Sequence, residues 1–327
     1  MKKVYGPVPS RRLGRSLGVG PIPFKTCDYS CVYCQLGRTT HMTIRRKDFF
    51  PREEILNEIK RVIEVESSHS YKELDFVTFV GEGEPTLCKS LGWLIRKTKE
   101  IADIPIAVDT NGSLLYREDV RNDLSQADVV MPSLDAGTAE TFRKINRPHR
   151  GIVFETVVEG MEKFRQEYGG EIWVEVMLVK GLNDSTEELE AIKSRLSPVE
   201  PNRTYINVPI RPPAEPWAVP PDKESIALAH AILRDVNVVD ITAEETGEFS
   251  IGGFTNPEDA ILAIIRRHPM RAEQVIETLK KFEVEERDVH DSLTRLEESG
   301  KIKKVKYREK VFWLTMEEKR GKEYKKK

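Results

Sequence analysis

Three of the four cysteines of this 327-residue chain lie within eight residues of one another. They are Cys27, Cys31 and Cys34, in the stretch Phe-Lys-Thr-Cys-Asp-Tyr-Ser-Cys-Val-Tyr-Cys-Gln-Leu. Free cysteines of a protein core scatter like other small apolar residues, so a cluster this dense indicates metal chemistry. Disulfides would leave one thiol over, and spacings this tight strain the geometry of the bridge.

Two kinds of metal site suit three clustered thiolates. A structural zinc ion takes four ligands in a closed tetrahedral shell, and His41 could complete a Cys3His set. An iron–sulfur cubane normally takes four thiolates. With only three, one iron keeps an open coordination position, which marks a reactive metal. On spacing alone both interpretations stand.

The elements that must position these cysteines alternate between strand and helix. A short strand near residues 17–19 leads into the cysteine loop. Strand patterns follow at 75–80, 104–108, 129–134, 172–179, 204–208 and 237–241, and helical patterns at 51–65, 90–101, 117–124, 139–145, 153–168, 186–196 and 222–234. The alternation predicts an α/β fold with a parallel sheet and outer helices. Six or so repeats fit a partial or complete (β/α) barrel better than an open sheet, and periodicity alone does not choose among these folds.

The pattern changes after Gly252. Helices are predicted at 257–267, 272–279 and 287–299, followed by strands at 302–307 and 311–314. Gly300 stands where a helix C-cap glycine belongs. Three helices and a hairpin resemble a winged helix. We therefore expect a barrel domain over residues 1–252 and a winged-helix-like domain with a basic tail over residues 253–327.

Polar motifs follow the predicted strands at the edge where β/α barrels carry their chemistry. The strand at 75–80 is followed by Gly-Glu-Gly-Glu-Pro-Thr (81–86), the next by Asp-Thr-Asn-Gly (109–112), and the next by Ser-Leu-Asp (133–135). Asn207 lies near the end of the strand at 204–208. Turn geometry explains the glycines, and it explains Asn111 equally well, but it leaves the two carboxylates at a strand end unexplained.

The spacing Cys-x3-Cys-x2-Cys, with Tyr33 before the third cysteine, resembles the signature of the radical S-adenosylmethionine (radical SAM) superfamily. The turn after the strand at 75–80 resembles that family's Gly-Gly-Glu-Pro element, with Glu82 in place of its first glycine. The resemblance implies that the fold is a partial (β/α)6 TIM-like barrel. It also implies that Cys27, Cys31 and Cys34 ligate a [4Fe–4S] cluster and that the open iron chelates S-adenosylmethionine. It implies that one-electron reduction by an external flavodoxin or ferredoxin generates a 5′-deoxyadenosyl radical. Cofactor contacts are then expected from Tyr33, Gly81, Glu82, Gly83, Glu84, Pro85, Asn111, Ser133, Asp135 and Asn207.

The stretch Val-Pro-Ser-Arg-Arg-Leu-Gly-Arg-Ser-Leu-Gly resembles a prokaryotic group of radical SAM proteins related to the wybutosine enzymes of tRNA. RNA modification by hydrogen abstraction is therefore the favoured function. A peptide or small metabolite is the alternative substrate, with the winged helix as its recognition module, and a zinc-stabilised regulator without catalysis is another alternative. Lys180 does not match the position of the wybutosine enzymes' Schiff-base lysine. Cys88 is the one remaining cysteine, so a second cysteine-ligated cluster is not expected.

Charge is distributed unevenly along a chain whose formal net charge is −2. Residues 1–47 hold ten Lys and Arg against one acidic residue, and residues 299–327 hold twelve against four. An anionic substrate is therefore expected. Arg11, Arg12 and Arg15 are candidates to hold its phosphate or carboxylate, and His149 is a candidate for catalysis.

The C-terminal helix at 287–299 is mainly acidic, so DNA groove reading is not expected, whereas the basic hairpin after it suits RNA backbone or an acidic peptide. Packing of that hairpin against the acidic remainder of the chain explains its charge equally well. Apolar runs are too short to cross a bilayer, and the N-terminus lacks a signal-peptide core. We therefore expect a cytoplasmic protein without membrane contact.

Overall fold

The computed structural model describes residues 2–68, 74–242, 257–280 and 286–316. The chain divides into two compact units, Met1–Gly253 and Phe254–Lys327. The predicted domain boundary near residue 252 and the basic tail at residues 324–327 fall outside the described residues. No helix in the described ranges combines the length and the apolar character needed to cross a membrane.

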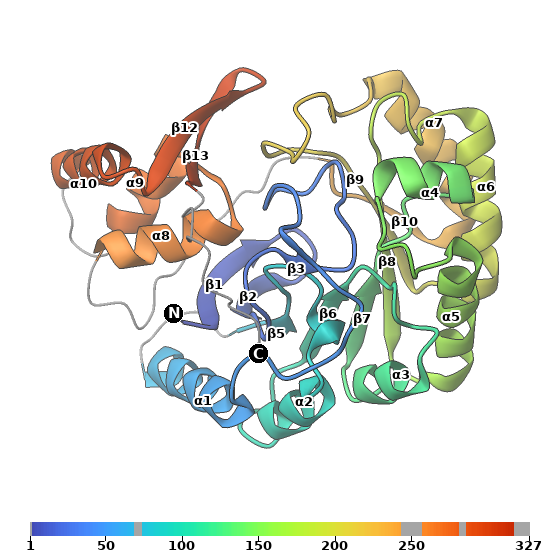
Figure 1. Cartoon of the computed structure of the whole chain (residues 1–327), viewed down its shortest axis with the longest axis horizontal. Helices are drawn as coiled ribbons and strands as arrows, with labels where there is room; N and C mark the ends of the chain where they lie inside the picture. Colours follow the sequence, from blue (N-terminus) through green and yellow to red (C-terminus); the bar gives the residue numbers. More distant parts are fainter. Residues whose placement is uncertain (1, 69–73, 243–256, 281–285, 317–327) are drawn as a thin grey trace, which may run out of the picture. The chain divides into compact units, whose positions relative to one another are not determined.

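An eight-stranded sheet forms the centre of the first unit (Figure 1). Neighbouring strands pair in parallel, except for the antiparallel hairpin of β1 and β2. In spatial order the strands are β1 (Val4–Ser10), β2 (Gly14–Val19), β5 (Phe76–Phe79), β6 (Ile106–Thr110), β7 (Val129–Pro132), β8 (Glu171–Met177), β9 (Arg203–Asn207) and β10 (Val238–Asp240). The predicted α/β class with a mostly parallel sheet is confirmed.

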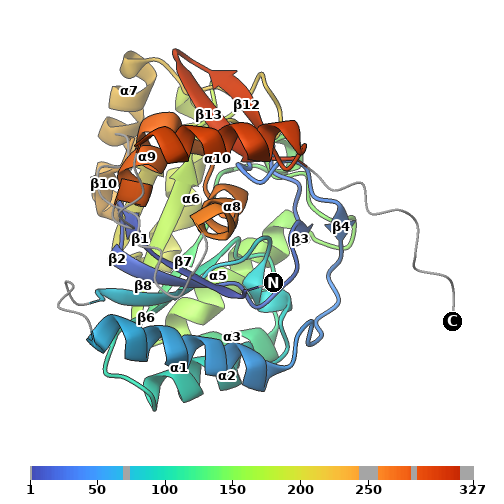
Figure 2. The same ribbon diagram turned by 90° about the vertical axis from the view of Figure 1, so that its left-hand side faces the viewer.

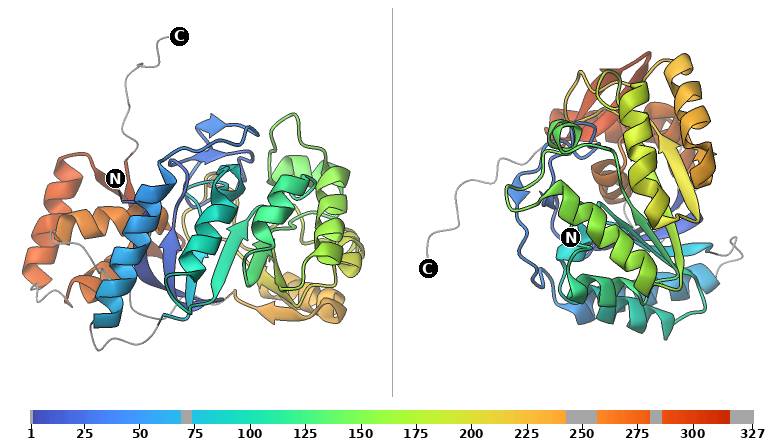
Figure 3. Two further views of the ribbon diagram at one scale, coloured as in Figure 1. Left: turned by 90° about the horizontal axis from the view of Figure 1, so that it is seen from below. Right: turned by 90° about the vertical axis from the view of Figure 1, so that its right-hand side faces the viewer.

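Helices cover the outer face of this sheet, and neighbours along the chain pack side by side, as α1 does with α2, α2 with α3 and α6 with α7 (Figure 3). Strand residues that point outward, such as Val108, Val130 and Val174, are fully buried beneath them. The helices are α1 (Arg52–Ser68), α2 (Leu91–Lys99), α3 (Glu118–Leu124), α4 (Ala139–Ile145), α5 (Phe154–Glu167), α6 (Thr186–Leu196) and α7 (Lys223–Leu233). Each lies within a few residues of its prediction.

The inner face of the sheet has an apolar layer and a polar layer. Ala107, Met131, Trp173 and Tyr205 form a small core with Leu13, which enters from the β1–β2 turn. Side chains alternate along a strand, so the next inward positions toward the carboxyl ends are Asp109, Glu175 and Asn207. The interior therefore becomes polar toward the edge where the cysteine loop and the strand-end motifs lie.

The described residues of the second unit form three helices and a three-stranded antiparallel sheet of order β11-β13-β12 (Figure 2). Its elements are α8 (Pro257–Arg267), β11 (Met270–Arg271), α9 (Ala272–Lys280), α10 (Glu286–Glu298), β12 (Ile302–Tyr307) and β13 (Lys310–Thr315). Gly300 has a φ of +68° and follows α10. Lys301 N donates to Leu296 O at 2.9 Å, so Gly300 closes the helix as the sequence predicted.

Candidate active site

The cysteine loop is held between two other loops by backbone hydrogen bonds. On one side Lys25 N donates to Glu82 O at 2.5 Å and Glu84 N donates to Thr26 O at 3.1 Å. On the other side Ser30 N donates to Asn146 O at 3.0 Å, and Val32 N donates to Ile145 O at 2.9 Å. The loop begins with the short strand β3 (Thr26–Cys27), which pairs with β4 (His41–Met42). The cysteines are thus held by main-chain contacts from distant parts of the chain.

Gly83 allows the closest of these approaches. It forms a parallel bridge with Thr26, and a Cβ atom at position 83 would lie 1.7 Å from Thr26 O. No side chain fits at that distance, so only glycine permits the turn to contact the cysteine loop. The Gly-Glu-Pro element is therefore a packing element for the cysteines, whatever else it binds.

Two amide side chains point at the cysteine sulfurs. Asn111 Nδ2 lies 3.7 Å from Cys27 Sγ, and Asn146 Nδ2 lies 3.6 Å from Cys31 Sγ. The three thiols are free and half-buried. Burial raises the pKa of each thiol, and nearby carboxylates add to the shift at Cys27 and Cys31. A metal centre must therefore displace protons from these sulfurs, and the amide N–H groups are placed to stabilise the resulting thiolates.

Asp28 and Glu84 are buried carboxyl groups linked through Asn111. Asp28 accepts hydrogen bonds from Asn111 Nδ2 at 2.6 Å and from the Ser113 hydroxyl. Glu84 Oε2 accepts from Asn111 N at 2.7 Å, while its other oxygen accepts from Thr110 Oγ1 at 2.6 Å. Burial raises the pKa of Glu84 to about 7, with Asp28 as the second cause. These carboxyl groups would be stabilised as anions by a bound cation.

Asp135 joins the cysteine loop to the ends of β7 and β8. It accepts hydrogen bonds from Tyr33 Oη at 2.5 Å, from Asn146 Nδ2 at 2.6 Å and from Met177 N at 2.9 Å. Burial raises its pKa to about 6. Two predicted site residues, Tyr33 and Asp135, are therefore in direct contact.

The remaining predicted site residues lie at different depths. Pro85 is buried in the 3₁₀ turn Pro85–Leu87, and Glu82 is buried beside it. Ser133 N donates to Thr110 O at 3.1 Å, at the carboxyl ends of β6 and β7. Asn207 lies in the polar interior layer, where its side chain accepts from Arg11 Nη2 at 3.1 Å and donates to Glu175 Oε1 at 3.2 Å. The roles of these residues as cofactor contacts remain predictions.

Arg11, Arg12 and Arg15 have protein partners. Arg12 reaches Asp109 at 3.0 Å and also pairs with Glu175, while Arg15 pairs with Glu66. Arg11 contacts Asn207 and the carbonyl of Ile241. The predicted role in holding a substrate anion therefore finds no support in the geometry of these three side chains.

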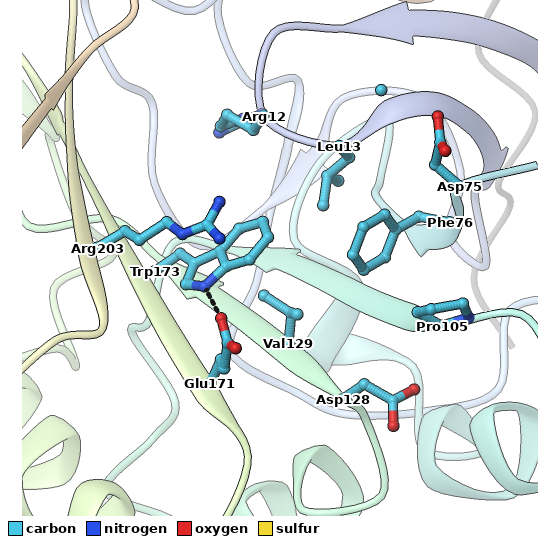
Figure 4. A pocket seen from close by; sticks show the side chains of 11 residues that line it. Arg12, Leu13, Asp75, Phe76, Pro105, Asp128, Val129, Glu171, Trp173 and Arg203 are labelled. Atoms are coloured by element: carbon cyan, nitrogen blue, oxygen red, sulfur yellow. Dashed lines mark hydrogen bonds between the residues drawn. The ribbon is translucent and has the colours of Figure 1, made fainter.

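A cavity of about 600 Å³ lies at the opposite, amino ends of the strands (Figure 4). Its walls include Arg12, Phe76, Trp173 and Arg203. The Arg203 guanidinium lies 4.2 Å from the Trp173 ring centre, and Trp173 Nε1 donates to Glu171 at 2.5 Å. The amino-terminal face of a β/α barrel serves stability in general, and these paired side chains agree with that role.

Sequence reasoning missed Glu215, which connects the loop after β9 to the cysteine loop by hydrogen bonds. Its side chain is buried and accepts from Arg38 Nε at 2.8 Å and from Arg147. Its backbone N donates to Val32 O at 2.9 Å. The proline-rich loop at residues 211–216 thus contacts the cysteine loop. The signal was present in Arg-Pro-Pro-Ala-Glu-Pro, but no sequence rule gives a long-range partner for a lone glutamate.

Sequence reasoning assigned no role to Asn183, which follows β8. Its side chain, fully buried, donates to the carbonyls of Asp135 and Met177 at 2.8 and 2.9 Å and accepts from Val179 N at 2.8 Å. These bonds satisfy backbone groups where β8 ends, beside Asp135. Asn183 therefore positions the Asp135 loop.

Among the residues that the structure describes, no three His, Cys, Asp or Glu side chains are arranged to hold one metal ion. His41 is exposed. The Cys3His zinc site considered above therefore gains no support. In a [4Fe–4S] cubane each thiolate binds a different iron, so its ligands need not converge on one point. The half-buried thiols and the two amides directed at them fit that group.

Residues 22–192 match the Radical SAM superfamily. The UPF0026 protein MJ1312 of Methanocaldococcus jannaschii is 39% identical over 318 residues, which cover 96% of each chain. The UPF0026 protein slr1464 of a Synechocystis strain is 38% identical over 210 residues, 64% of this chain and 76% of that one. A structure of TYW1 with a lysine-pyruvate adduct bound is 17% identical, has a TM-score of 0.47, and covers 92% of this chain and 80% of that one.

The protein belongs to the radical SAM superfamily and is therefore an enzyme of the class that uses a [4Fe–4S] cluster and S-adenosylmethionine. Within that superfamily it belongs to the UPF0026 proteins.

Replacing Gly83 by alanine tests the contact between the Gly-Glu-Pro turn and the cysteine loop. The added methyl group overlaps Thr26 O, so we expect G83A to lose about 2 to 3 kcal/mol of unfolding free energy, as other overpacked sites do. Urea denaturation measures this loss. A methyl group at Gly169 would meet nothing within 4 Å beyond its own chain neighbours, so G169A should change stability by less than about 0.5 kcal/mol. Equal effects of the two substitutions would contradict the assignment.

Replacing Glu215 by glutamine tests the bond between the 211–216 loop and the cysteine loop. Arg38 and then Arg147 hold the pKa of Glu215 below its usual range. Its stabilising contribution is present above the unfolded-state pKa and is lost as the pH falls through the lowered folded-state pKa. We expect E215Q to cost about 1 kcal/mol at pH 7, because the arginines are partly exposed, and to flatten the decline of stability below about pH 5. Denaturation between pH 3 and 8 measures both effects, with exposed Glu190 as the control in E190Q. Parallel pH profiles for wild type and E215Q would refute the role.

Proposed function

We propose that Cys27, Cys31 and Cys34 ligate the [4Fe–4S] cluster and that the polar groups around them bind S-adenosylmethionine. The observation that carries the proposal is the set of amide contacts from Asn111 and Asn146 to two of the three sulfurs. When bound, the cluster and S-adenosylmethionine together supply a 5′-deoxyadenosyl radical for hydrogen abstraction. In this proposal the eight-stranded sheet, whose strands follow one another in sequence order, curves into a partial barrel that surrounds the radical.

The residues of this chain have three tasks in that reaction. Asn111 and Asn146 donate hydrogen bonds toward the thiolates. Glu84 accepts from Thr110 and from Asn111 N, so its carboxylate fixes the turn whose backbone would contact the cofactor's amino group. Asp135 orients Tyr33 and Asn146 from the other side of the loop. Burial of these groups keeps water away from a reactive radical.

We propose RNA as the substrate class. Support comes from the sequence resemblance to the wybutosine group and from the exposed basic side chains of β12, which are Lys303, Lys304 and Lys306. Arg308 follows in the turn of the same hairpin. In the second unit, taken as a winged helix, this hairpin is the wing that contacts the phosphate backbone. The adjacent helix α10 carries Asp288, Asp291 and Glu298, which repel phosphate and disfavour groove reading.

Reconstitution under anaerobic conditions tests the chemistry. Protein loaded with iron and sulfide should release 5′-deoxyadenosine from S-adenosylmethionine when dithionite is added. In C31A one iron ligand is missing, so we expect the cluster content to fall and the release to drop at least a hundredfold. C88A removes a cysteine outside the loop and serves as the control. A colourless wild-type preparation with stoichiometric zinc would instead favour the regulator.

Binding of tRNA at graded salt concentrations tests the substrate class. Wild type should bind with an affinity that falls steeply with salt, and the double variant K303E/K306E should bind at least tenfold more weakly at low salt. The double variant K60E/K163E changes the same charge at exposed sites on α1 and α5 and should retain binding. Affinity that is indifferent to salt and to the hairpin variant would favour the peptide or metabolite alternative.

A further inference from the structure

A second cavity, of about 440 Å³, lies beside the cysteine loop on the outside of the sheet. It is formed by α4, by the loop between α4 and α5, and by the first turn of α5. Four basic side chains line it, Arg143, Arg147, His149 and Arg150, together with one acidic side chain, Glu155, which is paired with Arg195. Its apolar floor includes Phe142 and Phe154, whose ring centres are 5.2 Å apart.

The wall of this cavity is also the support of the cysteine loop. His149 N donates to Asp28 O at 2.7 Å, and Ser30 N lies 3.2 Å from Arg147 O. Arg147 follows Asn146 in the chain, and Asn146 Nδ2 lies 3.6 Å from Cys31 Sγ. The Tyr29 ring packs edge-on against Phe142 at 5.3 Å. The path from Arg147 in the cavity wall to the Cys31 sulfur therefore runs through one residue, Asn146, and its N–H···S contact.

The cavity is unsuited to the substrate of a radical reaction. Hydrogen abstraction needs contact with the radical, and the strand-end groups Glu84, Asn111 and Asp135 do not line this cavity. Electron transfer differs because it crosses a thin protein wall without contact between the reactants. This inference rests on the proposed function, which needs one electron from an external donor. The cavity suits the docking of that donor.

The charge of the rim identifies the kind of donor. Arg143 and Arg150 are exposed, and Arg147 is half-buried. Gly151 lies against Ile44, which places the exposed Arg45 close to the same rim. Basic rims steer acidic partners, and electron-transfer complexes are small and bind weakly.

We propose that this rim is the docking surface of an acidic one-electron carrier protein of the flavodoxin or ferredoxin type. The carrier seats its acidic side chains on Arg143 and Arg150 and places its redox centre over the wall formed by Arg147 and His149. One electron leaves the reduced carrier and enters the cluster through this wall, so the carrier is oxidised by one electron while no bond to the protein forms or breaks. His149 contributes here through its backbone N–H, which donates to Asp28 O.

The test compares R143E/R150E with wild type and with K163E, which reverses an exposed charge elsewhere on α5. Calorimetric titration of each full-length holoprotein with purified oxidised flavodoxin and with ferredoxin measures binding without turnover. We expect wild type and K163E to bind at least one carrier with similar affinity, weakening as salt rises, and R143E/R150E to bind at least tenfold more weakly. Release of 5′-deoxyadenosine should fall to the same extent with the reduced carrier and stay within twofold of wild type with dithionite.

The outcomes separate this proposal from the proposed function. A wild type that is inactive with dithionite refutes the proposed function. Two results would refute the docking surface alone, provided that the wild type is active with dithionite. Either R143E/R150E binds the carrier as tightly as wild type does, or no carrier binds to wild type at all. Loss of tRNA binding in R143E/R150E with carrier binding intact also refutes it and assigns the rim to RNA. Melting temperatures within about 2 °C of wild type establish that the variants are folded.

Discussion

The site depends on one constraint, which is that the cysteine loop has little regular structure of its own and is held by backbone hydrogen bonds from both sides. Gly83 contacts it at a distance that no other residue allows, and the carbonyls of Ile145 and Asn146 accept from it on the other side. Backbone contacts fix position more firmly than flexible side chains do. The thiols are therefore held in place by groups that need no metal to form, so the site is largely organised before a cluster binds.

The carboxyl groups around the loop have consequences for what binds there. Asp28, Glu84 and Asp135 are buried, and burial raises the pKa of each. The groups that donate hydrogen bonds to their oxygens within the described part of the chain are neutral amides, hydroxyls and a thiol. Neutral donors orient a carboxylate but do not supply the positive charge that offsets its desolvation. In the proposed function, the sulfonium and ammonium groups of S-adenosylmethionine would supply that charge.

The sequence allowed prediction of the features that depend on local pattern. The α/β alternation follows from apolar periodicity, and the strand-end motifs follow from the rule that barrel chemistry lies at carboxyl ends. The strand β1 was missed because Gly6, Pro7 and Pro9 interrupt its pattern, although its pairing with β2 tolerates them at a sheet edge. Arg12 was misjudged because its partners, Asp109 and Glu175, are nearly a hundred residues or more away. Local pattern identifies a charged side chain but not the buried carboxylate that it meets.

The two ends of the sheet differ in the contacts that their charged side chains make. At the amino ends the Arg203 guanidinium stacks on the Trp173 ring, while Arg12 is paired with Asp109 and Glu175. In the proposed function the substrate reaches the polar layer from the carboxyl ends, where the cysteine loop and the 211–216 loop meet through Glu215. An electron carrier that used the same entrance would compete with the substrate. A basic rim on the outer wall, joined to Cys31 through Asn146, gives the electron a separate route, so reduction need not wait for the substrate to leave.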